Sequence, residues 1–87
     1  MKTKLDEEIL QKNGYKECYL NSRIRYFESP DNKVHIHTDL FVNKILWEVY
    51  VYGYWKNERV IIDRKDVANI KQLNQLLCVY GIEELKI

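Results

Sequence analysis

The chain is poor in the residues that interrupt or loosen a fold. Its 87 residues include one proline, three glycines and a single alanine, Ala68. With 46% hydrophobic residues beside so little Pro and Gly, a disordered or collagen-like chain is excluded. The two cysteines, Cys18 and Cys78, are too few and too far apart for the disulfide framework of a small secreted domain. We therefore expect one domain over residues 1–87, built around one core.

Long apolar runs and an excess of one charge are also absent. No run approaches the roughly 18 apolar residues that a membrane-spanning helix needs. Fourteen basic and 13 acidic residues leave a net charge of +1, so no strong field directs the chain to nucleic acid or to a membrane. The charged start, Met1 to Glu8, lacks the apolar stretch of a secretion signal. These features predict a cytoplasmic protein with no membrane partner.

Apolar residues recur at helical spacing near both ends of the chain. The pattern predicts a short helix over 4–12, with acidic residues in its first turn and Asn13-Gly14 as its end. A second helix is predicted over 67–80, with Asp66 as its N-cap and Gly81 after its last turn. The apolar positions that carry these predictions are Leu5, Ile9 and Leu10, and then Val67, Ile70, Leu73, Leu77 and Tyr80.

Between the helices, the period changes to two and aromatic and β-branched residues become frequent. Strands are predicted near 23–28, 33–38, 45–55 and 58–62. A turn at Ser29-Pro30-Asp31-Asn32 and a tight turn at Lys56-Asn57 join two of the pairs. Residues 15–20 are either an edge strand or a linker, and 83–87 are either a short edge strand or a loose end. The predicted fold is α+β: a short N-terminal helix, an antiparallel β-meander of about four strands, and a C-terminal helix packed on one sheet face.

The longest predicted strand has two different faces. Alternation places Trp47, Val49, Val51 and Gly53 on a core face and Glu48, Tyr50, Tyr52 and Tyr54 on the other. A two-residue turn would pair Gly53 with Val60 and Val51 with Ile62 on the core face. On the other face it would pair Tyr52 with Ile61 and Tyr54 with Arg59.

The non-core face gathers the residues that we predict to bind a partner. In a matching register, His35 and His37 lie near Glu48, and a four-residue loop at 29–32 places Tyr26 beside His35. Tyrosine offers a large flat contact area with a polar tip at a small entropic cost. The predicted partner-binding residues are Tyr26, His35, His37, Tyr50, Tyr52, Tyr54 and Arg59. The competing interpretation is that a helix covers this face and the tyrosines are ordinary half-buried packing residues.

The chain shows no pattern that carries catalysis or a cofactor. Cys18 and Cys78 are not placed at a helix N-terminus that would lower a thiol pKa, and the chain has no Gly-rich phosphate loop. His35 and His37 could serve as ligands, but the two cysteines lack the close spacing of a zinc site. We therefore expect no enzyme activity, no bound metal and no cofactor.

A non-enzymatic interaction protein is the leading hypothesis for function. Lys, Ile, Asn and Tyr make up more than a third of the chain, a usage typical of AT-rich genomes and of phage or mobile-element proteins. We expect the chain to bind and inhibit or modulate a host macromolecule, for example a defence nuclease as an anti-CRISPR-like inhibitor does.

Two other interpretations use the same face. The first is an RNA or single-stranded nucleic-acid binding module, because bases stack on strand aromatics and residues 18–65 carry eight basic against six acidic side chains. The second is a homodimer, because an open aromatic sheet face often pairs with its own copy.

Overall fold

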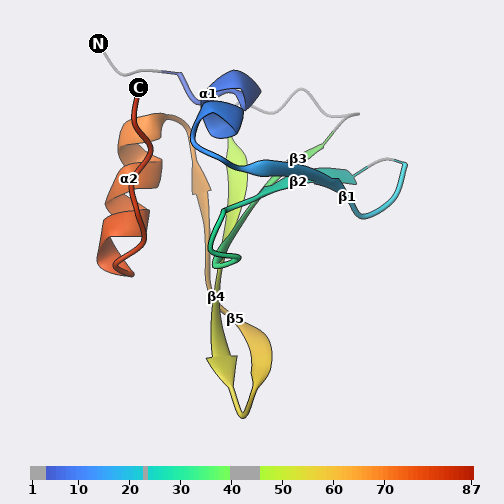
Figure 1. Cartoon of the computed structure of the whole chain (residues 1–87). Coiled ribbons are helices and arrows are strands. Elements are labelled where there is room, and N and C mark those ends of the chain that lie inside the picture. The colour runs from blue at the N-terminus through green and yellow to red at the C-terminus, as the bar shows by residue number, and fades with distance from the viewer. Residues whose placement is uncertain (1–3, 23, 40–45) are drawn as a thin grey trace.

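The computed structural model describes residues 4–22, 24–39 and 46–87 and shows an antiparallel meander flanked by two helices (Figure 1). In chain order, the elements are α1 (Glu7–Lys12), β1 (Lys16–Tyr19), β2 (Ile24–Glu28), β3 (Val34–Asp39), β4 (Trp47–Trp55), β5 (Glu58–Val67) and α2 (Ile70–Val79). The described strands form one sheet in the order β1-β2-β3-β4-β5. The predicted α+β meander is confirmed, with five strands instead of about four because residues 16–19 pair with β2 as an edge strand. Arg23 and Ile45, the first residues of two of the predicted strands, lie outside the described residues.

The core lies between one face of the sheet and the two described helices. The buried sheet residues are Phe27, Val34, Ile36, Val49 and Val51, and the helices add Leu10, Ile70, Leu73, Leu76 and Leu77. Trp47, predicted on the core face, is only partly buried and packs at the margin of this cluster. The helices therefore use the apolar stripes that their sequence periodicity predicts, and both cover the same side of the sheet.

Helix α1 begins later than predicted. Asp6 adopts an extended backbone, and its Oδ1 accepts a hydrogen bond of 2.9 Å from the Ile9 N–H, so Asp6 is the N-cap of a helix that starts at Glu7. Leu5 is buried although it precedes the helix. The predicted end is confirmed: Gly14 has a φ of +83°, in the left-handed region that stops a helix.

Helix α2 also begins later than predicted, because the strand before it is longer. Val67 and Asp66 pair with Trp47 and Glu48 as the last residues of β5, so Asp66 is not the N-cap. That role belongs to Asn69, whose side chain accepts from the Gln72 N–H. At the other end, Gly81 has a φ of +67° and the Ile82 N–H donates to the Leu77 carbonyl at 2.9 Å. This is the predicted left-handed stop, with Ile82 buried against the core.

The β4–β5 hairpin extends beyond the helices (Figure 1). Lys56 and Asn57 both have positive φ, which identifies a type I′ turn and confirms the two-residue connection. Gly53 pairs with Val60 as predicted, but Val51 pairs with Asp63 and not with Ile62, because a β-bulge lies between these pairs. Residues 53–62, which we call the arm, lie past the helices. Val60 and Ile62, predicted in the core, are therefore exposed.

The C-terminal tail is ordered by two asparagine side chains instead of by a strand partner. The Asn74 amide donates to the Leu85 carbonyl and accepts from the Leu85 N–H. The Asn13 amide makes the same pair of bonds with the backbone of Lys86. Residues 83–87 are thus neither an edge strand nor a loose end, and Leu85 is buried in the core.

Candidate functional site

All seven predicted partner-binding residues lie on the sheet face opposite the core. Register places Tyr26 beside His37 and Tyr54 beside Arg59 on neighbouring strands, while His35 pairs with Tyr50. The described helices pack against the other face, so the described part of the chain provides no helical cover here. We call this surface the tyrosine–histidine face; it comprises Tyr26, His35, His37, Tyr50, Tyr52, Tyr54 and Arg59.

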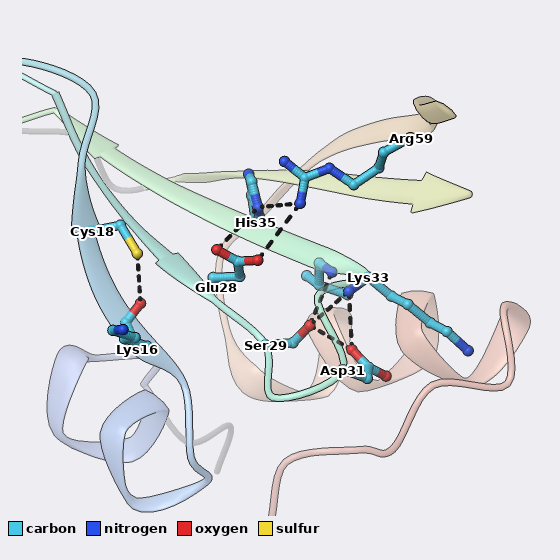
Figure 2. Close-up of polar contacts among 9 residues, drawn as sticks. Lys16, Cys18, Glu28, Ser29, Asp31, Lys33, His35 and Arg59 are labelled. Atoms are coloured by element: carbon cyan, nitrogen blue, oxygen red, sulfur yellow. Dashed lines mark hydrogen bonds and ion pairs between the residues drawn. The ribbon is translucent and has the colours of Figure 1, made fainter. Parts of the chain in front are cut away.

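The β2–β3 connection sets the position of Tyr26, and it is longer than predicted. Glu28 pairs with His35, so six residues and not four separate the paired positions. Ser29 organises this loop, because its hydroxyl accepts from the backbone N–H groups of Lys33 and Val34 (Figure 2). The register differs from the predicted one by two residues. A shift of two keeps every side chain on its face, so Tyr26 still joins the histidines.

Five aromatic rings on this face contact one another in a continuous cluster. The ring centroid of Tyr26 lies 4.6 Å from that of His35 and 5.3 Å from that of His37. The ring centroid of His35 lies 4.6 Å from that of Tyr52, and the ring centroid of His37 lies 4.7 Å from that of Tyr50. Each imidazole therefore lies between two tyrosines, in the spacing at which aromatic pairs stabilise one another. His35 is only 5% exposed although no described helix covers it, because its neighbours on the sheet enclose it.

A polar group at the side of the cluster connects Arg59 to His35. Figure 2 shows Glu28, His35 and Arg59 pointing toward one another from three strands. The Arg59 Nη1 lies 3.4 Å from the His35 Nε2 and 3.6 Å from Glu28, and its guanidinium lies over the Tyr52 ring at 4.6 Å. Because a guanidinium can only donate, the contact favours a neutral His35 whose Nε2 accepts.

A second arginine, Arg64, belongs to this face and was not predicted. Its Nη2 lies 2.7 Å from Glu48 Oε2 and 3.3 Å from Asp66, and its guanidinium lies 5.8 Å from the Tyr50 ring centre. The Tyr50 hydroxyl donates to the same Glu48 oxygen at 2.9 Å. Strict alternation from Val60 would place residue 64 on the core face. The bulge at Ile62 reverses that alternation, so no sequence signal could have found Arg64.

Tyr54 is the exception among the predicted residues. It shares the face but lies on the arm, where it is 67% exposed and contacts none of the clustered rings. Cys18, by contrast, is a β1 residue that pairs with Tyr26 of β2, and it therefore lies next to the cluster. Its thiol contacts the Lys16 carbonyl oxygen at 3.7 Å. Among the described residues, no three His, Cys, Asp or Glu side chains are grouped as metal ligands.

Burial favours the uncharged form of both histidines and of Tyr26 and Tyr52. Burial is the main cause that lowers the pKa of His35 and His37 and raises the pKa of Tyr26 and Tyr52. The His37 Nε2 is buried and has no hydrogen-bond partner among the described residues. A neutral ring tolerates that position better than an imidazolium would.

Acid is therefore expected to destabilise the fold through the two histidines. For His35, burial lowers the pKa, Glu28 opposes this, and Arg59 lowers it further; for His37, burial lowers the pKa and Glu48 opposes. The unfolded chain then binds these protons more readily, so the stabilisation is present above the ordinary pKa of 6.5 and is lost as the pH falls below it. Melting temperatures from circular dichroism should be level between about pH 8 and 7 and should fall toward about pH 5.5.

The control is the double variant His35→Gln with His37→Gln, which removes both titrating rings. Its melting temperature should change less over the same pH interval than that of the original chain. An equally steep fall in the variant would show that other groups cause the acid sensitivity.

Comparison of the chain with protein-family models, with curated proteins and with solved structures found no match. None of the described helices is long and apolar enough to cross a membrane.

Proposed function

We propose that this protein acts without catalysis, by binding another protein through the tyrosine–histidine face. The observation that carries the proposal is a tyrosine-rich sheet face that no described helix covers, at the end of which an arm exposes further aromatic and aliphatic residues. Tyrosine, tryptophan and arginine are the residues that most often dominate the binding energy of protein interfaces.

The fixed positions of the side chains within the tyrosine–histidine face support binding. The rings of Tyr50 and Tyr52 are held against His37 and His35, and arginine side chains pack over both tyrosines. Side chains that are already fixed lose little conformational entropy when a partner docks. The cluster is therefore a preorganised contact area.

Charge favours a protein partner over nucleic acid. The two arginines of the face contact three carboxylates, because Arg59 lies beside Glu28 and Arg64 lies beside Glu48 and Asp66. Phosphate binding depends on several basic side chains whose charge is not already neutralised. The clustered rings also stack on one another, which leaves fewer ring faces for bases.

The identity of the partner remains a prediction from composition. An origin in a phage or mobile element, and an inhibitory action on a host defence nuclease, agree with a small binding protein. These expectations define where to search first: in extracts of low-GC bacteria.

The experiment compares partner capture by the original chain and by the double variant Tyr50→Ala with Tyr52→Ala. The variant should keep its circular dichroism spectrum and lose a partner that the original chain enriches, with binding to the purified partner at least about 100-fold weaker. Val79→Ala is the matched control, because Val79 is 76% exposed on α2, on the opposite side of the sheet. A partner that both variants retain would exclude this face. A large loss of thermal stability in the double variant would assign the tyrosines to packing.

Nucleic acid remains the second candidate because Arg59 and the tyrosines share one surface. Fluorescence anisotropy with single-stranded RNA, single-stranded DNA and duplex DNA at low and high salt decides this point. Binding that weakens steeply with salt and is lost in Arg59→Ala would replace the protein partner with nucleic acid.

A further inference from the structure

A small cavity lies between the C-terminal tail, the β2–β3 loop and the connection from α1 to β1. Its volume is about 110 Å³. Apolar groups of four residues form part of its wall: Tyr15, Pro30, Ile82 and Leu85. A cavity of about 150 Å³ accommodates a molecule the size of benzene, so this one has room for about four or five non-hydrogen atoms. None of the lining residues belongs to the tyrosine–histidine face.

The hydroxyl of Tyr15 is a buried polar group at this cavity. Tyr15 is only 5% exposed, and its Oη has no hydrogen-bond partner among the described residues. Burial, and after it the negative charge of Asp31, raise the pKa of this hydroxyl, so it lies in the field of a carboxylate that lines the same cavity. A buried hydroxyl without a partner is destabilising. A bound group that hydrogen-bonds to Tyr15 would remove that cost.

Three carboxylates line the cavity, and none of its described lining residues is basic. They belong to Asp31, Glu83 and Glu84, all of which are exposed, so solvent reaches the cavity from their side. Asp31 Oδ1 accepts from the Ser29 hydroxyl at 2.6 Å and from the Lys33 N–H at 3.0 Å (Figure 2). None of the hydrogen bonds among the described residues uses Asp31 Oδ2, which is left to bind a cation.

The neighbouring basic side chains neutralise little of this charge. Lys86 Nζ lies 3.9 Å from Glu83 Oε1, but both side chains are 84% exposed, and such a surface pair is weak. Asp31 and Glu84 have no ion-pair partner in the described part of the chain. The cavity therefore combines an apolar wall with negative charge that is not compensated.

The spacing of the carboxylates suits an organic cation and not a metal ion. Within residues 4–22, 24–39 and 46–87, no three His, Cys, Asp or Glu side chains are grouped closely enough to hold a metal. An alkylammonium ion is larger, donates three hydrogen bonds from its head and carries an apolar chain. Its head would give the Tyr15 hydroxyl oxygen a donor and the Asp31 carboxylate a charge-assisted hydrogen bond.

We propose that this cavity binds a small, free primary alkylammonium ion. The ammonium group lies between the Tyr15 hydroxyl and Asp31, and the alkyl chain packs against Ile82 and Leu85. The charges of the two tail glutamates attract the cation to the cavity. This inference does not rest on the proposed function, because the cavity and the tyrosine–histidine face share no residue.

An NMR titration of the ¹⁵N-labelled whole chain with n-butylammonium chloride, at constant ionic strength, tests the site. The backbone amides of Asp31, Glu83 and Glu84 should shift to saturation with a Kd of about 1–10 mM, as expected for a ligand of about five non-hydrogen atoms. n-Butanol has the same chain without the charge and should bind at least about tenfold more weakly. No saturable shift up to about 50 mM n-butylammonium, or equal affinity for n-butanol, would overturn the proposal.

Three variants locate the cation. Asp31→Asn keeps the acceptor for Ser29 and should weaken n-butylammonium binding about tenfold. Glu58→Gln removes the same charge on the arm, away from the cavity, and should bind as the original chain does. Tyr15→Phe should weaken binding about fivefold without lowering the melting temperature, because the lost hydroxyl has no partner in the free chain.

Two results with these variants would contradict the site. Equal binding by Asp31→Asn and Glu58→Gln would mean that the cation is attracted by acidic residues in general. A Tyr15→Phe chain that melts well below the original would show that the hydroxyl is already bonded in the free protein.

Discussion

Phe27→Ala is expected to lower the free energy of unfolding by about 3–5 kcal/mol, the cost of a large-to-small change in a closed core. Phe27 is fully buried in β2, where it pairs with Ile36 at the centre of the sheet. The guanidinium carbon of Arg25 lies 5.9 Å from its ring centre, so the variant also loses this contact. A chain of this size has a total stability of about 4–13 kcal/mol, so the variant would lose a large share of it.

Urea denaturation followed by circular dichroism measures this loss. Tyr19→Ala is the control, because Tyr19 is an aromatic residue on the neighbouring strand that is 63% exposed, and its replacement should cost less than about 1 kcal/mol. Equal midpoints for the two variants would contradict the assignment of Phe27 to the centre of the core.

Asn74→Ala is expected to cost about 1–3 kcal/mol, although Asn74 is a polar residue on a helix. Its side chain makes both hydrogen bonds that hold the backbone of Leu85, at 2.8 Å from the N–H and 3.1 Å to the carbonyl. Without them, the two backbone groups lose their partners and Leu85, which is 5% exposed, is no longer held in the core. Local release of the tail should also appear as faster amide exchange at Leu85.

Asn74→Asp is the matched variant for this test. An aspartate keeps the acceptor for the Leu85 N–H but sets a carboxylate oxygen against the Leu85 carbonyl oxygen, so it should also destabilise the fold at neutral pH although it is the same size as asparagine. Destabilisation of Asn74→Ala by less than about 0.5 kcal/mol would mean that the tail is held by apolar packing alone.

The sequence could predict which residues share the tyrosine–histidine face, because a shift of the strand register by two residues keeps every side chain on the same face. The loop between β2 and β3 is two residues longer than predicted, and Tyr26 pairs with His37. Since an even shift preserves the face, Tyr26 still reaches both imidazoles. A strand shift of one residue would have moved Tyr26 into the core.

The β-bulge in β5, by contrast, changes the sheet face on which the residues after it lie, and the sequence pattern did not predict it. One extra residue at Ile62 inverts the alternation that follows, which turns Arg64 toward Tyr50 and brings Asp63 to the Tyr80 hydroxyl at 2.6 Å. The predicted start of α2 was wrong because it also depends on strand pairing between residues distant in the chain. Asp66 is a good N-cap by residue type, but pairing of Val67 with Trp47 keeps the chain extended until Asn69 takes that role.

The sequence by itself determined the order of the two helices and of β2 to β5, the apolar face of β4, the two-residue turn at Lys56-Asn57 and the glycine that ends α2. These features depend on neighbouring residues, through backbone preference and the spacing of apolar side chains. Only the tertiary structure decided where each strand stops, that His35 is enclosed without a helix above it, and that the arm lies beyond the core. Those outcomes depend on how far the helices and the tail extend over the sheet, and this is set by contacts between residues distant in the chain.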